Sequence, residues 1–288
     1  MAVKFFGQFL VEQGVVSSEA LLGAINLQEK NNMKLGEMAL SMGLLAPADI
    51  ERAHNAQMSR DMKLGDLLIE MGFLTLNQLN DIITRQKNTH LYIGEALVRI
   101  GALTGDNLQK QLEAFKADQA EYVSNAIELP IAVANGSIWE MTADLTCKMI
   151  TRMLDLKFRT GKCTLVTAIA PNFMLAAIDF SGDVEARYLL SVSEGLQKSI
   201  AKAILSEVSV DKEPVEVLED TVMEFINVVC GNVAAKASQT GVIMNINPPM
   251  TLHPPEEGLP IPENHTALSF PIHIEDGDTM ELILLIKN

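Results

Sequence analysis

The stretch that decides the fold of the first part of the chain is Lys63–Gln86, with the sequence KLGDLLIEMGFLTLNQLNDIITRQ. It predicts a short amphipathic helix that ends at Gly72, a two-residue apolar link, and a longer helix that begins after Thr75. Thr75 is a favourable N-cap, and Gln78 three residues later completes a capping box. Neither helix can bury its apolar face alone, so the stretch requires neighbours of its own kind.

The same pattern occurs four times with a period of 29 residues. Three columns carry this period: Gly7, Gly36, Gly65 and Gly94; Gly14, Gly43, Gly72 and Gly101; Leu21, Ile50, Leu79 and Leu108. A period shared by independent columns indicates an internal repeat. We therefore predict an all-α helical repeat domain over residues 1–118, built from four units that each contain a short and a longer helix.

Composition and charge narrow the function classes. The 288 residues are 48% hydrophobic and 20% charged, which is typical of globular domains. The net charge of −15 divides into −3 on residues 1–119 and −12 on residues 120–288. An acidic second half without a basic patch argues against DNA or RNA binding.

The sequence also bears on the compartment. We expect no signal peptide, because polar residues interrupt the first 14 positions, and no membrane insertion. The three cysteines, Cys147, Cys163 and Cys230, have no CxxC spacing and predict reduced, buried thiols. Together these features predict a cytoplasmic protein.

The second and third repeats resemble the block of the MshEN family, found at the N-terminus of pilus and type II secretion ATPases. That block begins Arg-Leu-Gly and ends in Gln, and two tandem blocks hold one cyclic di-GMP. The resemblance covers about the first 115 residues. It implies nucleotide-binding residues Lys34, Leu35, Gly36 and Gln57 in one block and Lys63, Leu64, Gly65, Asp66 and Gln86 in the next.

The blocks also depart from that family. Its leading arginine is replaced by Phe5, Lys34, Lys63 and Tyr92, and the fourth block ends in Phe115 instead of glutamine. Lysine offers a point charge where arginine offers a planar fork, so we expect weaker nucleotide binding. Two alternatives stay open: a ligand-binding repeat, or one that has become a protein-docking surface. The blocks could pair as 1–2 and 3–4, or blocks 2 and 3 could pair.

From about Tyr122 the period disappears. We expect helices within 121–156, 193–206 and 215–240, and strands at 163–170, 173–180, 186–192 and 242–246. A hairpin of 265–274 with 279–286 is expected across Asp276-Gly277. This order of helices and mostly antiparallel strands predicts an α+β domain over residues 122–288.

The segment Val222–Val233 is apolar almost all the way round, so most of it should be buried in a helix. Its exceptions Glu224, Asn227 and Gly231 fall at i, i+3 and i+7, on one narrow stripe. A glycine in a helix interior costs about 1 kcal/mol relative to alanine. The glycine therefore suggests that something approaches this stripe closely.

This segment resembles the signature helix of the CheC/CheX/FliY phosphatase family, and the resemblance extends over about residues 122–288. The signature has an acidic residue, Glu-x-x-Asn and Gly-Asn, here Asp220, Glu224 with Asn227, and Gly231-Asn232. A single such helix is present, which resembles the CheX branch. The resemblance therefore implies a CheX-like fold, a mostly antiparallel sheet with long helices, and a homodimer.

The activity that this family implies is hydrolysis of the aspartyl phosphate of a CheY-like response regulator. Glu224 and Asn227 would be the catalytic residues, with Asn227 orienting water and Glu224 docking a lysine of the partner. Gly231 and Asn232 would contact the partner. The resemblance implies Mg²⁺ on the partner, and neither a cofactor nor a metal site in this chain.

Two other functions remain open. The chain could be a non-catalytic adaptor that binds a response regulator through the same helix, or a cyclic di-GMP receptor whose second half is an output surface. The sequence contains no GxxxxGK[ST] motif, so we predict that it is not an ATPase.

Overall fold

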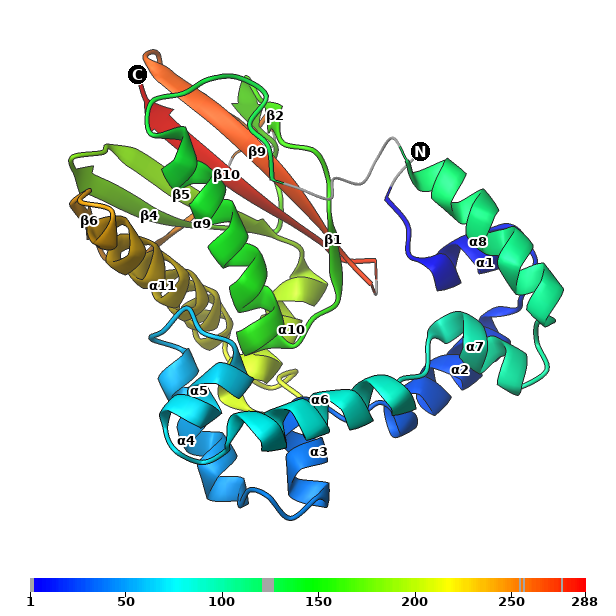
Figure 1. The fold of residues 1–288 in the computed structure, drawn as a ribbon. Helices are drawn as coiled ribbons and strands as arrows, with labels where there is room; N and C mark the ends of the chain where they lie inside the picture. The colour runs from blue at the N-terminus through cyan, green and yellow to red at the C-terminus, as the bar shows by residue number, and fades with distance from the viewer. Residues whose placement is uncertain (1–2, 121–126, 254, 256, 276) are drawn as a thin grey trace. The chain divides into compact units, whose positions relative to one another are not determined.

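The computed structural model describes residues 3–120, 127–253, 255, 257–275 and 277–288. The chain divides into two compact units, Met1–Glu121 and Tyr122–Asn288 (Figure 1). Among the described residues, no helix has both the length and the hydropathy that a membrane span requires.

The first unit consists of helices in its described part. Short and longer helices alternate: α1 (Phe6–Glu12), α2 (Ser18–Asn31), α3 (Leu35–Ser41), α4 (Pro47–Gln57), α5 (Leu64–Glu70), α6 (Leu76–Thr89), α7 (Ile93–Arg99) and α8 (Gly105–Gln119). Thr75 caps α6, since its hydroxyl accepts a hydrogen bond from the Gln78 amide at 3.3 Å, and the Gln78 side chain accepts one from the Thr75 amide at 2.8 Å. The capping box predicted at this position is therefore present.

The two glycine columns have different physical causes. A Cβ built on Gly65 would lie 2.7 Å from a methyl group of Leu79, so this glycine lets the short helix approach the longer one of its own block. The other three glycines of that column face Leu21, Ile50 and Leu108 in the same way. Gly72 has a φ of 73°, the left-handed conformation that ends the short helix.

The four blocks pair as 2 with 3 and as 1 with 4. Helix α3 packs against α6 and α4 against α5, around a core that includes Met38, Leu68 and Ile82. Helix α7 of the last block packs against α1 and α2 of the first, around Leu10 and Leu97. Of the pairings left open by the sequence, the structure therefore contains that of blocks 2 and 3.

Glutamines at the ends of the blocks tie each pair together. The Gln57 side chain donates to the Met62 carbonyl at 2.8 Å, and Gln86 donates to the Met33 carbonyl at 2.9 Å. In the other pair Gln28 donates to the Leu91 carbonyl at 3.0 Å. The equivalent position in the fourth block is Phe115, whose ring lies instead 5.3 Å from that of Phe6 and 5.4 Å from that of Phe9.

The second unit is built on one eight-stranded antiparallel sheet. Its main path has the order β1-β9-β10-β5-β4-β6, while β2 pairs with β9 and β7 pairs with β4. The strands are β1 (Phe158–Thr160), β2 (Thr164–Leu165), β4 (Met174–Gly182), β5 (Ala186–Val192), β6 (Met244–Ile246), β7 (Met250–Leu252), β9 (His265–Ile274) and β10 (Thr279–Lys287). A separate two-stranded sheet joins β3 (Ala168–Ile169) to β8 (Leu259–Pro260).

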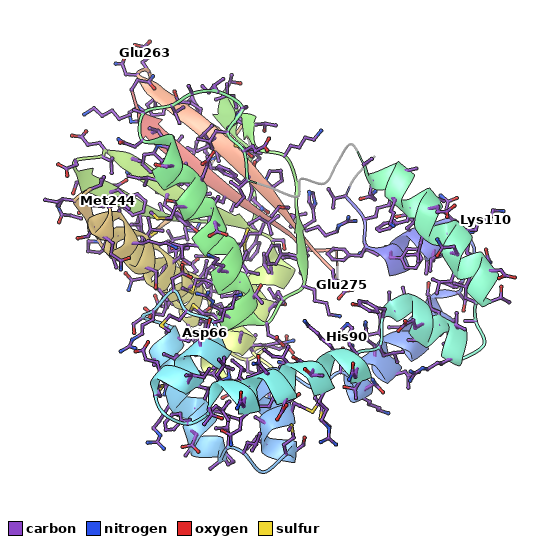
Figure 2. All side chains as sticks on the ribbon, viewed as in Figure 1. Asp66, His90, Lys110, Met244, Glu263 and Glu275 are labelled. Atoms are coloured by element: carbon purple, nitrogen blue, oxygen red, sulfur yellow. The ribbon has the colours of Figure 1, made fainter. Side chains whose placement is uncertain are left out.

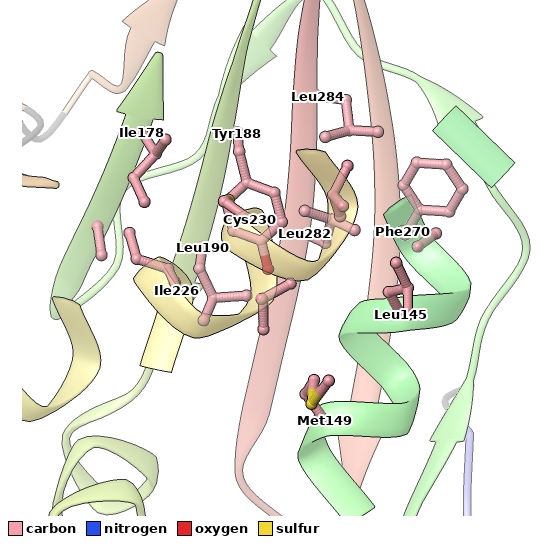
Figure 3. Close-up of a cluster of buried hydrophobic side chains, with 14 of the residues drawn as sticks. Leu145, Met149, Ile178, Tyr188, Leu190, Ile226, Cys230, Phe270, Leu282 and Leu284 are labelled. Atoms are coloured by element: carbon pink, nitrogen blue, oxygen red, sulfur yellow. The ribbon is translucent and has the colours of Figure 1, made fainter. Parts of the chain in front are cut away.

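Helices cover one face of the large sheet. They are α9 (Gly136–Met149), extended by the π-helix η1 (Ile150–Leu154), α10 (Glu194–Leu205) and α11 (Val215–Gln239). Alternate strand residues such as Tyr188 and Leu282 meet Leu145 of α9 and Ile226 of α11 in the main core (Figure 3). The other face has a smaller apolar cluster that includes Leu189 and Ile283, against which Leu252 and Leu259 pack.

The α+β prediction for this unit is confirmed, and its three longest strands and last two helices match the predicted ranges within two residues. Two details differ. The strand expected at 163–170 is divided into β2 and β3, and the helix expected within 121–156 occupies 136–154. Asp276 of the predicted hairpin turn, and residues 121–126 of the predicted helix, lie outside the described part of the chain.

Candidate functional site

The candidate site lies on α11, a 25-residue helix with one thoroughly buried face. Val222, Phe225, Ile226 and Val229 are fully buried in the main core, which fixes the rotation of the helix about its axis. Because these positions are fixed, residues on the opposite side of the helix point away from the sheet. Apolar spacing in the sequence therefore determines which polar side chains reach the surface.

Glu224 is exposed and Asn227 is half-buried, one helical turn apart on the outward face. Neither side chain makes a hydrogen bond or an ion pair with another described residue. Their polar groups are therefore available to a molecule outside the chain. The structure brings these two predicted catalytic residues together, as their spacing indicates.

Asn232 does not belong to this surface. Its side chain is 8% exposed, and its amide donates a hydrogen bond to the Val228 carbonyl at 2.9 Å. It lies seven residues after Phe225 and therefore on the buried face of the helix. The side chain of Asn232 is therefore buried and bonded within the helix, and its contact with a partner stays a prediction.

Gly231 lies one turn beyond Asn227 and is half-buried. A Cβ built on it would meet no heavy atom within 4 Å. The helix loses about 1 kcal/mol by having glycine there in place of alanine, and no contact among the described residues accounts for this loss.

The surroundings of the site limit its own chemistry. Burial raises the pKa of the Cys230 thiol well above its usual value, so this thiol stays protonated and is no nucleophile. Among the described residues, no cluster of three or more His, Cys, Asp or Glu side chains could hold a metal ion. The Thr251 hydroxyl of β7 donates a hydrogen bond to the Met223 sulfur at 3.6 Å and so links β7 to α11. No sequence pattern indicated this contact.

The predicted nucleotide residues divide into packed and exposed groups. Leu35 and Leu64 pack against the core of blocks 2 and 3, and Gly36 and Gly65 are buried against the longer helices. The Gln57 side chain is 6% exposed and, like Gln86, bonds to a main-chain carbonyl. In the structure these six residues pack or bond within the unit formed by blocks 2 and 3.

Lys34, Lys63 and Asp66 are the predicted nucleotide residues whose side chains are exposed. Lys34 and Lys63 precede α3 and α5, and Figure 2 shows Asp66 on α5. In block 2 the Glu37 carboxylate accepts a hydrogen bond from the Lys34 amide at 2.8 Å. The equivalent Asp66 has no such bond, and neither it nor the Lys63 ammonium has a polar partner among the described residues.

Comparison with solved structures finds resemblances over about half of the chain. The chemotaxis protein CheX from Desulfovibrio desulfuricans matches with a TM-score of 0.47 and 14% identity, over 52% of this chain and 99% of that chain. A CheC-like superfamily protein from Shewanella sp. PV-4 matches with a TM-score of 0.47 and 18% identity, over 54% and 100%. A CheX–CheY–BeF3–Mg²⁺ complex from Borrelia burgdorferi matches with a TM-score of 0.45 and 19% identity, over 52% and 98%.

A search of the curated proteins finds no match. A family profile matches the second unit over most of its sheet and all of α10 and α11. Residues 174–273 of this chain match the family described as chemotaxis phosphatase CheX.

Proposed function

We propose that the second unit removes phosphate from the aspartyl phosphate of a CheY-like response regulator. The observation that carries this proposal is the position of Glu224 and Asn227. They lie one turn apart on an outward face, without polar partners among the described residues, inside the segment that matches the CheX family. Side chains with a structural role would be expected to bond within the fold, as Asn232 does.

Hydrolysis of an aspartyl phosphate requires few catalytic groups. An acyl phosphate is labile, so the enzyme needs to hold a water molecule in line with the aspartyl oxygen that leaves. The carboxamide of Asn227 can accept a hydrogen bond from that water and orient it without any change of charge. Water forms the new bond to phosphorus as the bond to the aspartyl oxygen breaks, and the products are aspartate and inorganic phosphate.

Glu224 suits a docking role. A carboxylate on the surface can pair with a lysine ammonium beside the phosphoaspartate of the partner and so fix the register of the two proteins. We assign Glu224 no role as a general base, because hydrolysis of a labile acyl phosphate needs only an oriented water. The Mg²⁺ needed to balance the phosphoryl charge would be held by the partner, so this chain requires no cofactor of its own.

The direct test is phosphate release from a CheY-like response regulator that has been phosphorylated with acetyl phosphate in the presence of Mg²⁺. The full chain is expected to accelerate the release catalytically, at substoichiometric amounts. If the release rate is unchanged while the two proteins still bind, the adaptor alternative replaces the enzyme. The homodimer that the resemblance implies is part of the proposal and is tested by light scattering of the same sample.

For the first unit we infer a ligand-binding role, with cyclic di-GMP as the ligand. The specific observation is the pairing of blocks 2 and 3, which places the two lysine-bearing blocks in one pair and the aromatic residues Phe5 and Tyr92 in the other. Lys63 and Asp66, three positions apart, offer an ammonium and a carboxylate without polar partners among the described residues. A lysine can pair with a phosphate, and a carboxylate can accept hydrogen bonds from a guanine edge.

Calorimetric titration of cyclic di-GMP into the full chain is expected to give one ligand per chain. Lys63→Ala is expected to weaken the affinity about tenfold, because it removes a cation from the pair that binds the anion. Tyr92→Ala is the matched control and should leave the affinity unchanged. Heat in the wild type that is insensitive to Lys63→Ala would place the ligand elsewhere. No heat at all would favour the docking-surface alternative.

A further inference from the structure

Gly231 is a feature of the α11 surface that no contact among the described residues explains. It lies in the interior of a 25-residue helix with a helical main chain, so no turn requires a glycine. An added Cβ would meet nothing within 4 Å, so no neighbouring element requires one either. Gly65 and Gly72 of the first unit each have such a reason, a 2.7 Å approach and a positive φ. No described residue therefore accounts for the absence of a side chain at 231.

Gly231 lies on the same face of α11 as the two proposed catalytic residues. On the outward face it follows Asn227 by one turn, and the next outward position is occupied by Ala235. Glu224 lies on the other side of Asn227. Along this line of the helix the surface is thus acidic toward the start, at Glu224, and carries the small residues Gly231 and Ala235 after Asn227.

Depth of docking matters for the proposed reaction. An asparagine side chain is short, so a water molecule that it holds stays close to the helix. The phosphoryl group of the partner must come to that water, and the chain segment that carries it must come equally close. A side chain at 231 would stand beside Asn227 on the same face of the helix and would hold this segment away from the main chain of α11.

We propose that Gly231 is a positioning residue: the main chain of the partner, beside its phosphoaspartate, packs directly on the bare helix at 231. This contact sets the depth at which Asn227 meets the attacking water. The inference rests on the proposed function and specifies the partner surface as main chain, without a bulky side chain at the contact.

The test is a size series at this position in the full chain. Gly231→Ala is expected to raise the denaturation midpoint, because alanine favours the helix and the site has room for it. The same variant is expected to raise the KM for the phosphorylated regulator about tenfold, and Gly231→Leu further, because a displacement of about 1 Å is costly to a positioned reaction. A purely structural glycine would give the opposite result, lower stability with an unchanged KM.

Two control variants separate docking from helix stability. Gly105→Ala fills another open helical glycine, in the first unit, and should stabilise the protein without changing the KM. Ser238→Leu enlarges an exposed residue two turns beyond Gly231 and should leave the KM unchanged. If Gly231→Ala leaves the KM unchanged in an active enzyme, the inference is wrong while the phosphatase proposal stands.

An inactive wild type would count against the phosphatase proposal and leave the contact measurable by binding. The regulator is then loaded with beryllofluoride and Mg²⁺, and its affinity for the wild type and for Gly231→Ala is compared. The inference requires about tenfold weaker binding by the variant. Equal affinities, or no binding by either protein, would overturn it.

Discussion

Replacement of Asn227 by alanine is expected to lower the turnover of a phosphorylated response regulator about a hundredfold. The amide is the group that we assign to orient water, and no other described side chain of the outward stripe offers both a donor and an acceptor. The free energy of unfolding should change by less than about 0.5 kcal/mol, because the Asn227 side chain has no polar partner to lose among the residues that the structure describes. Phosphate release and chemical denaturation of the same sample measure the two quantities.

Asn232 provides a matched control on the same helix. Asn232→Ala removes a buried hydrogen bond to the Val228 carbonyl and is expected to destabilise the protein by about 1 kcal/mol. Its effect on turnover should be small under conditions where the protein stays folded. If both asparagine variants lower stability and turnover together, the outward stripe is not the catalytic surface.

The repeat can be recognised from the sequence because the features that define it are local. Capping residues, helix-ending glycines and apolar spacing act within one block, and the four blocks carry them at a constant period. The pairing of blocks depends on contacts between residues far apart in the chain. Asn32 and Leu91, for example, exchange two hydrogen bonds of 2.7 and 2.9 Å across 59 positions. No local pattern contains such information.

In the second unit, the sequence predicts the long elements and, apart from β6, does not delimit the short ones. Strands β5 and β9 and helix α11 each present many residues in one period, so their limits are well marked. Strands β1, β7 and β8 have three residues or fewer, which is too short for alternation to be recognised. They form because the larger sheet or a neighbouring strand offers a partner.

At the site, residue type alone does not say which face of the helix a side chain occupies. Glu224, Asn227 and Asn232 are all polar residues in an apolar helix, and the family signature includes them together. Helical spacing separates them, because Asn232 shares the face of Phe225 whereas Glu224 and Asn227 do not. Applied to every polar position, the periodicity that predicts the helix would also have assigned Asn232 to the core.

The same helix spacing places the site residues outside and Phe225 in the core, and a substitution of Phe225 has the largest expected effect on stability. Phe225 lies between Glu224 and Asn227 in sequence, is fully buried, and packs in the main core beneath the outward stripe. Phe225→Ala is expected to lower the free energy of unfolding by about 3–5 kcal/mol, since it removes a large apolar side chain and leaves a cavity. Glu224→Ala, its exposed neighbour, should change it by less than about 0.5 kcal/mol.

The milder Phe225→Leu keeps most of the buried volume and should cost less, so the series can be followed by urea denaturation even if the alanine variant does not fold. Because the same ring fixes the rotation of α11, Phe225→Leu is also expected to lower phosphate release in the folded protein, although Phe225 does not reach the surface. A folded Phe225→Leu variant with normal turnover would show that Asn227 does not depend on this packing for its position. Unfolding energies that fall equally in Phe225→Ala and Glu224→Ala would contradict the assignment of the two faces of the helix.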